Sequence, residues 1–208
     1  TNTQFFTDEI IQRLSKTSIS LHIQFPTLDR SKFQLITKSD SYDNLIQNLL
    51  KLKSEKVSFS LNYVLLTPNI SDFRNLLPFL FQNEISLKLL PYVNEKTLKH
   101  NKFEKEIFPF LDSISFKFEN QNNGSLKWWL KTPQDSAITI KYINSPCFKF
   151  EFDICRNYKE IRLTPSLEIQ SCLINTEDNL KLDISLKDSS KQNIKDLFEQ
   201  SWKNFTHC

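Results

Sequence analysis

The sequence predicts an α/β protein, either part of a β/α barrel or a parallel α/β sheet, followed by a small β-rich cap that carries cysteines. Helix-like and strand-like segments alternate over the first 120 residues, the pattern typical of parallel sheets. The polar loop Asn120–Ser125 breaks the alternation, and short β-like segments with three cysteines follow it. We therefore expect a barrel domain at 1–124 and a cap domain at 125–208.

The chain begins with a predicted helix and strand. Thr7–Lys16 has a capping residue, Thr7, and two acidic residues in the first turn, and both features favour a helix. Ser18–Ile23 alternates apolar and polar residues, which indicates a strand.

Two further helix–strand pairs and a fourth strand are predicted next. Leucines at helical spacing predict a helix at Ser41–Lys53, and Ser71–Gln82 also favours one despite Pro78. Val57–Leu66 begins by alternating and ends as an apolar run, as a strand buried on both faces would. A polar helical stretch separates the third strand from the fourth. The three strands are Val57–Leu66, Ile85–Leu90 and Ile114–Glu119.

The predicted cap contains short strands and one terminal helix. The strands are Ala137–Tyr142, Glu160–Thr164 and Leu167–Leu173, the last two joined by a turn at Pro165–Ser166. A helix from about Lys191 to Phe205 would place apolar residues on one face.

Composition excludes several classes of function. The chain has one glycine, so neither a Rossmann glycine motif nor a P-loop can exist in it. A net charge of +3, from 27 basic and 24 acidic residues, gives no broad basic surface for nucleic acid or an anionic membrane. No apolar run approaches the roughly 20 residues that span a bilayer, and no signal peptide is visible. We expect a cytoplasmic protein.

Because the chain contains no methionine, we also expect it to be a fragment or a processed product.

Three clustered cysteines are the main candidates for chemistry. Cys147, Cys155 and Cys172 are separated by seven and sixteen residues, and cysteine clusters in a reducing compartment favour metal binding over disulfides. They suit an iron–sulfur cluster, or a zinc site with Cys208 or His207 as fourth ligand. By spacing alone, three separate buried thiols explain the pattern equally well.

Around these cysteines, Arg162-Leu163-Thr164 is followed eight positions later by Cys172-Leu173. This order and spacing resemble the C-terminal region of radical SAM enzymes of the molybdenum cofactor biosynthesis protein A type. The resemblance extends upstream in order. The segments that carry it are Thr1-Asn2, Ser20-Leu21-His22, Leu28-Asp29, Lys32-Phe33, Ile36-Thr37, Leu61-Asn62-Tyr63-Val64 and Ser145-Pro146.

This resemblance implies a cofactor set and an activity. Cys147, Cys155 and Cys172 would hold an auxiliary [4Fe–4S] cluster, and Arg162 would contact the substrate, a small molecule or a peptide. S-adenosylmethionine would lie near three residues of the barrel, which are Asn2, Ser20 and Asn62. The complete enzyme would reduce S-adenosylmethionine to a 5′-deoxyadenosyl radical that abstracts hydrogen.

The radical-generating Cys-x3-Cys-x2-Cys motif would lie upstream of Thr1, so this chain alone is expected to be inactive. A degenerate, non-catalytic relative that acts as a binding module is the alternative, and a zinc-binding cap is a third. His22 and Trp128-Trp129 are weaker candidates for the site, and structural roles are the simpler interpretation of all three. The sequence predicts no oligomeric state.

Overall fold

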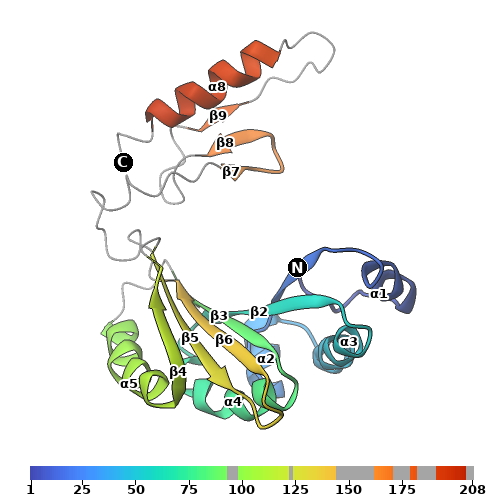
Figure 1. Cartoon of the computed structure of the whole chain (residues 1–208). Coiled ribbons are helices and arrows are strands. Elements are labelled where there is room, and N and C mark those ends of the chain that lie inside the picture. Colours follow the sequence, from blue (N-terminus) through green and yellow to red (C-terminus); the bar gives the residue numbers. More distant parts are fainter. Residues whose placement is uncertain (93–97, 122–123, 144–161, 171–178, 182–190, 205–208) are drawn as a thin grey trace. The chain divides into compact units, whose positions relative to one another are not determined.

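The computed structural model describes residues 1–92, 98–121, 124–143, 162–170, 179–181 and 191–204 (Figure 1). The chain divides into two compact units, Thr1–Asn144 and Ser145–Cys208. The first unit begins with helices and strands in alternation, which are α1 (Asp8–Leu14), β1 (Ser20–Gln24), α2 (Arg30–Thr37), α3 (Tyr42–Ser54), β2 (Ser58–Leu65), a 3₁₀ turn (Ile70–Asp72), α4 (Phe73–Gln82), β3 (Ser86–Pro91) and α5 (Leu98–Ile114). It continues with three consecutive strands, β4 (Ser115–Asn120), β5 (Ser125–Lys131) and β6 (Ala137–Ile143).

The strands of the first unit form one six-stranded sheet in the order β1-β2-β3-β6-β5-β4. β1, β2, β3 and β6 are parallel neighbours, whereas β5 runs antiparallel to both β6 and β4. The α/β class is therefore confirmed, with a sheet that is parallel in one half and antiparallel in the other.

The fourth predicted strand does not continue the parallel series. β4 lies at the far edge of the sheet, and β6 takes the place beside β3. The reason is local: short turns join β4 to β5 and β5 to β6, so these strands form an antiparallel meander. Gly124, at φ 70°, and Asp135, at φ 62°, supply left-handed residues in the two turns.

The meander also moves the boundary between the units. β5 and β6 belong to the six-stranded sheet, so the first unit extends to Asn144 instead of ending at 124. The strand predicted at Ala137–Tyr142 forms as β6, in this sheet and not in a cap.

The second unit has fewer described residues. β7 (Arg162–Leu163), β8 (Glu168–Gln170) and β9 (Leu180–Lys181) form a three-stranded antiparallel sheet, and α8 (Lys191–Asn204) follows. The hairpin between β7 and β8 and the terminal helix agree with the sequence prediction.

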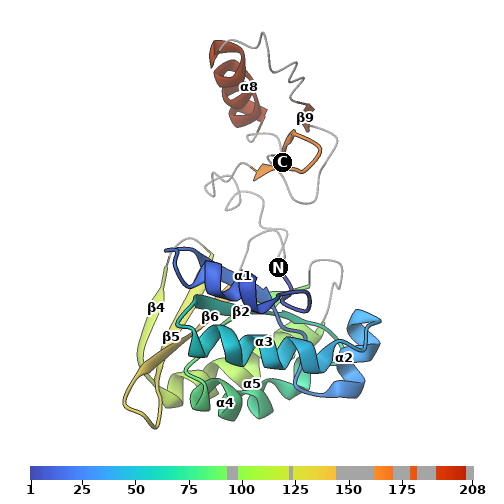
Figure 2. The ribbon, with the colours of Figure 1, turned by 90° about the vertical axis from the view of Figure 1, so that its right-hand side faces the viewer.

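Helices cover one face of the six-stranded sheet. α2, α3, α4 and α5 lie on the same side of it (Figures 1 and 2). The strand residues that point toward them are almost fully buried; among the largest are Ile23, Leu61, Tyr63, Leu65, Leu87, Leu89, Trp128, Ile140 and Tyr142. Because side chains alternate along a strand, the intervening residues point to the opposite face, and those residues are mostly polar.

The helix α2 is the main element that the sequence analysis missed. Asp29 caps it by accepting a hydrogen bond from the Lys32 backbone N–H at 3.0 Å. Lys38 ends it in a left-handed conformation at φ 57°, a position where glycine is usual. With a lysine in place of that glycine, the sequence carried no clear stop signal.

Thr1 pairs with the outer edge of β1. Its N–H donates to the His22 carbonyl at 3.0 Å and its carbonyl accepts from the Gln24 N–H at 2.7 Å. This is the bonding pattern of a parallel bridge between Thr1 and Ile23. α1 then leads from this bridge back to the start of β1, as a helix does in a βαβ unit.

None of the described helices combines the length and the apolar character that crossing a membrane requires.

Candidate functional site: the polar face of the six-stranded sheet

The face of the sheet opposite the helices carries two rows of polar side chains. Strand register places one row across all six strands, through Gln24, Asn62, Lys88, Lys141, Lys127 and Glu119. The neighbouring row contains His22, Ser60, Ser86, Thr139, Trp129 and Lys117. A parallel sheet ordinarily buries both faces, so a polar face is a candidate for ligand binding.

Three lysines stand side by side in the first row. Lys88 pairs in register with Lys141, and Lys141 pairs with Lys127, which puts neighbouring backbones about 4.8 Å apart. Among the described residues, none of the three forms an ion pair with a carboxylate. Like charges directly opposite one another destabilise a sheet, so this row is unfavourable unless an anion lies against it.

The central lysine of the row, Lys141, has a lowered pKa. Partial burial lowers the pKa of Lys141, and the charges of Lys88 and Lys127 lower it further. The pKa of His22 is also lowered, first by burial and then by Lys88 and the terminal ammonium. His22 Nδ1 lies 2.8 Å from the Ser60 hydroxyl. The register of the three lysines concentrates positive charge on this face.

Trp129 lies in the second row between two lysines. The Lys117 and Lys127 ammonium groups are 4.4 and 4.5 Å from the centre of its ring system, within the range of cation–π attraction. The indole is half-buried and provides a flat aromatic surface beside the lysine row.

Asn62 contributes an unpaired acceptor to the same face. Its side-chain oxygen Oδ1 is buried and has no hydrogen-bond partner among the described residues. A buried acceptor without a donor costs about 1–3 kcal/mol. Asn62 stands between Gln24 and Lys88 in the row, so a ligand that donates a hydrogen bond here would meet lysines on its other side.

The structure separates the three residues predicted for S-adenosylmethionine. Ser20 starts β1 in register with Ser58, whose hydroxyl donates to it at 3.1 Å. Asn62 lies four residues farther along β2, about 13 Å away. Asn2 is exposed and follows the Thr1 bridge at the level of Gln24, so it lies nearer to the row of Asn62. His22 lies in the middle of β1.

Arg162 belongs to the second unit. It is exposed on β7 and pairs in register with Gln170 of β8. In the turn between these strands, Leu167 takes a left-handed conformation at φ 62°.

The predicted metal ligands Cys147, Cys155 and Cys172 lie outside the described residues, as do Cys208 and His207. Within the described part of the chain, no three His, Cys, Asp or Glu side chains gather to hold a metal ion.

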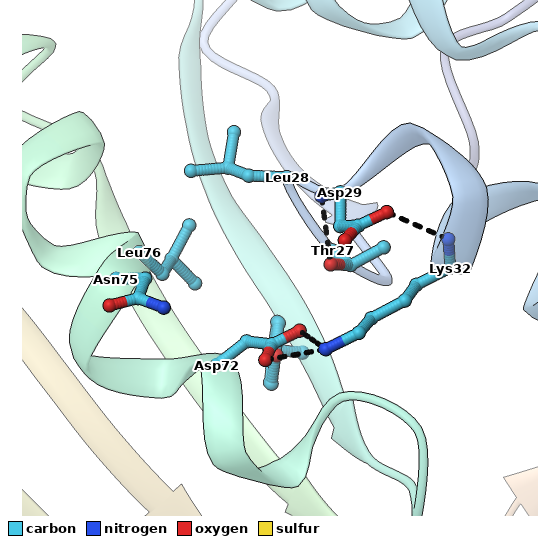
Figure 3. Close-up of a pocket in the computed structure, with 8 residues that line it drawn as sticks. Thr27, Leu28, Asp29, Lys32, Asp72, Asn75 and Leu76 are labelled. Carbon is cyan, nitrogen blue, oxygen red and sulfur yellow. Dashed lines mark hydrogen bonds and ion pairs between the residues drawn. The ribbon is translucent and has the colours of Figure 1, made fainter.

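A pocket of about 320 Å³ lies on the helix side of the sheet, between the start of α2 and the start of α4 (Figure 3). Lys32 Nζ crosses it and contacts both Asp72 carboxylate oxygens, at 2.7 and 2.6 Å. The charges of Lys32 and Asp72 thus compensate each other. The pocket is therefore a weaker candidate for ligand binding than the polar face.

The lysine row was not predicted from the sequence. Alternation alone could have put Lys88 and Lys141 on the polar faces of their strands. Their contact depends on β6 pairing with β3, and that pairing was not expected because β6 was assigned to the cap.

Searches of protein-family models, of curated proteins and of solved structures find no match to this chain.

Proposed function

We propose that this chain is part of a radical SAM enzyme and that the polar face of its sheet is the inner wall against which S-adenosylmethionine and the substrate bind. The single observation that carries the proposal is the polar row across all six strands, on the face opposite the described helices α2 to α5 of the first unit. In a β/α barrel the helices lie outside and the second face of the sheet lines the interior, so a partial barrel explains why these helices of the first unit share one face of the sheet.

The chemistry of the row suits S-adenosylmethionine. Asn62 Oδ1 is a buried acceptor that no described residue satisfies, and the ligand's ammonium and adenine amino groups are donors. Lys88 would attract its carboxylate. When bound next to an iron–sulfur cluster, the ligand supplies the radical that abstracts hydrogen from a substrate. The residues described here would hold and orient it.

Cys147, Cys155 and Cys172 would hold an auxiliary [4Fe–4S] cluster, with Arg162 on the substrate side. The resemblance of the Arg162–Leu173 segment supports this assignment.

A second candidate function is a non-catalytic binding module for an anionic small molecule. The lysine row favours this function, because three lysines on adjacent strands can bind a phosphate or carboxylate group. Such binding requires no radical chemistry.

Calorimetric titration with S-adenosylhomocysteine, a stable analogue, tests the first proposal. We expect saturable binding that weakens about tenfold in Asn62→Ala, since one hydrogen bond is lost. Asn44→Ala, at an exposed position of α3, is the matched control and should bind as the wild type does. An absence of binding to the analogue would remove the S-adenosylmethionine assignment.

Titration with pyrophosphate distinguishes the second candidate. Under that proposal pyrophosphate binds to the wild type, and Lys141→Gln weakens this binding. Lys16→Gln, at an exposed position after α1, should bind pyrophosphate as the wild type does. Binding of pyrophosphate without binding of the S-adenosylmethionine analogue would favour the binding module.

Anaerobic reconstitution with iron and sulfide tests the cluster. We expect the chain to take up iron and Cys172→Ser to take up much less, with Ser171→Ala as the control. Equal iron in wild type and Cys172→Ser would rule the cluster out, and zinc without iron in the purified protein would favour the zinc site.

A further inference from the structure

The outer edge of β4 is an exposed strand edge with apolar side chains. β4 pairs with β5 on one side, and no described strand pairs with its other side. Phe116 and Phe118 are 61% and 49% exposed. An exposed edge strand with apolar residues is a site for pairing with another chain.

The backbone of β4 offers hydrogen bonds at one central position. The Gln121 N–H donates to the Ser125 carbonyl at 2.9 Å in the turn after β4. Bonded and non-bonded pairs alternate along an antiparallel ladder, so Lys117 and Glu119 bond to β5 while Phe118 does not. The N–H and carbonyl of Phe118 therefore point to the open edge.

The side chains of β4 are arranged so that the strand complements itself. If two copies of β4 pair antiparallel with Phe118 opposite Phe118, the two phenylalanines exchange both backbone hydrogen bonds. Lys117 of each copy then stands opposite Glu119 of the other. These flanking pairs are of the non-bonded type, in which side chains approach more closely, and both carry opposite charges.

The other face of the same pairing is apolar. Phe118 contacts Trp128, with 5.3 Å between ring centres, and points to the helix side of the sheet. Two copies would bring Phe118 against Phe118 across the symmetry axis. One strand thus provides an apolar contact on one face and two ion pairs on the other.

We propose that the chain forms a homodimer through antiparallel pairing of β4 with β4 of a second copy, which joins the two six-stranded sheets into one. Homodimers with such two-fold, self-complementary interfaces are the commonest oligomers. The proposal does not depend on the ligand of the polar face or on the cysteines.

Sedimentation equilibrium of the full chain tests the proposal, with circular dichroism to check folding. We expect a dimer for the wild type. Lys117→Glu replaces two ion pairs with two like-charge pairs, so the dissociation constant of its dimer should be at least roughly tenfold higher. Glu119→Lys should do the same. The double variant Lys117→Glu/Glu119→Lys restores both pairs in reverse and should dimerise like the wild type.

Mixing the two single variants gives the sharpest control. Each alone should be mostly monomeric, while an equimolar mixture should form heterodimers. In the mixed dimer, the glutamate introduced into one chain faces the lysine introduced into the other, and the unchanged Glu119 and Lys117 also face each other. A damaged fold could not be repaired by mixing. A monomeric wild type, or single variants that dimerise as well as the wild type does, would overturn the proposal.

Discussion

Individual side chains on the polar face are held in an arrangement that costs stability. Lys141 has a lysine on each side in the neighbouring strands, and its pKa is lowered by burial and by both of them. A fold optimised only for stability would place a carboxylate or a neutral residue at one of the three positions. The uncompensated positive charge that destabilises the row also attracts anions to it.

Lys141→Gln should therefore stabilise the ligand-free protein. Removing the central charge relieves two like-charge contacts, each worth roughly 0.2–1 kcal/mol. Urea unfolding at neutral pH measures the gain, with Lys16→Gln as the control that should change little. If Lys141→Gln lowers the free energy of unfolding instead, the lysines are not in repulsive contact.

The same residue predicts a pH dependence. Because the pKa of Lys141 is lower in the folded state than its usual 10.5, the unfolded chain binds more protons just below pH 10.5. Stability attributable to this residue therefore rises with pH through that window. Urea unfolding of wild type and Lys141→Gln along a pH series should show the difference between them shrinking as the pH approaches 10.5.

Elements of the first unit are joined at the ends of their strands by buried polar contacts. Asn69, fully buried after β2, donates to the carbonyls of Pro26 and Val64 at 2.7 and 3.0 Å. Its side-chain oxygen accepts from the Leu66 N–H at 2.8 Å. One side chain thus fixes the loop after β2 and ties it to the segment after β1.

Asn69→Ala should be among the most destabilising substitutions in this unit. It leaves two carbonyls and one N–H without their partner, and we expect a loss of about 2–4 kcal/mol. Asn83→Ala, which removes a single bond to the Phe79 carbonyl, should cost less than about 1.5 kcal/mol. Chemical denaturation of both variants checks the order; equal losses would contradict the role given to Asn69.

At the scale of the whole molecule, local patterns predicted the elements better than their pairing. The leucine spacing of α3 and the alternation of β2 are properties of short segments, and both elements form where the sequence indicated. The place of β6 beside β3 depends on two tight turns and on contacts between distant residues. No local pattern in Ala137–Tyr142 distinguishes a strand of the main sheet from a strand of the cap.

The candidate site was predictable to the same extent. Asn62 was chosen through a family resemblance and lies in the polar row, whereas the lysines that flank it required the register of three strands. The predicted cluster at Cys147, Cys155 and Cys172 stays a prediction, because these residues lie outside the described part of the chain.

The first unit should fold on its own. The main hydrophobic core is built from residues of Thr1–Asn144, and it includes both helices and strands of that unit. We expect a fragment of residues 1–144 to unfold in one cooperative thermal transition, followed by far-ultraviolet circular dichroism. A fragment without a cooperative transition would show that the second unit is needed to complete the core.

The alternation of β5 also gives this fragment a built-in optical reporter. Trp128 and Trp129 are its only tryptophans, and they point to opposite faces of the same strand. Trp128 is 1% exposed and donates to the Asp112 carboxylate at 2.6 Å; Trp129 stands among lysines that attract anions. Iodide should therefore quench the emission of Trp129 and spare that of Trp128. The quenchable part of the fluorescence would then follow occupancy of the polar face, while the protected part would follow the integrity of the core.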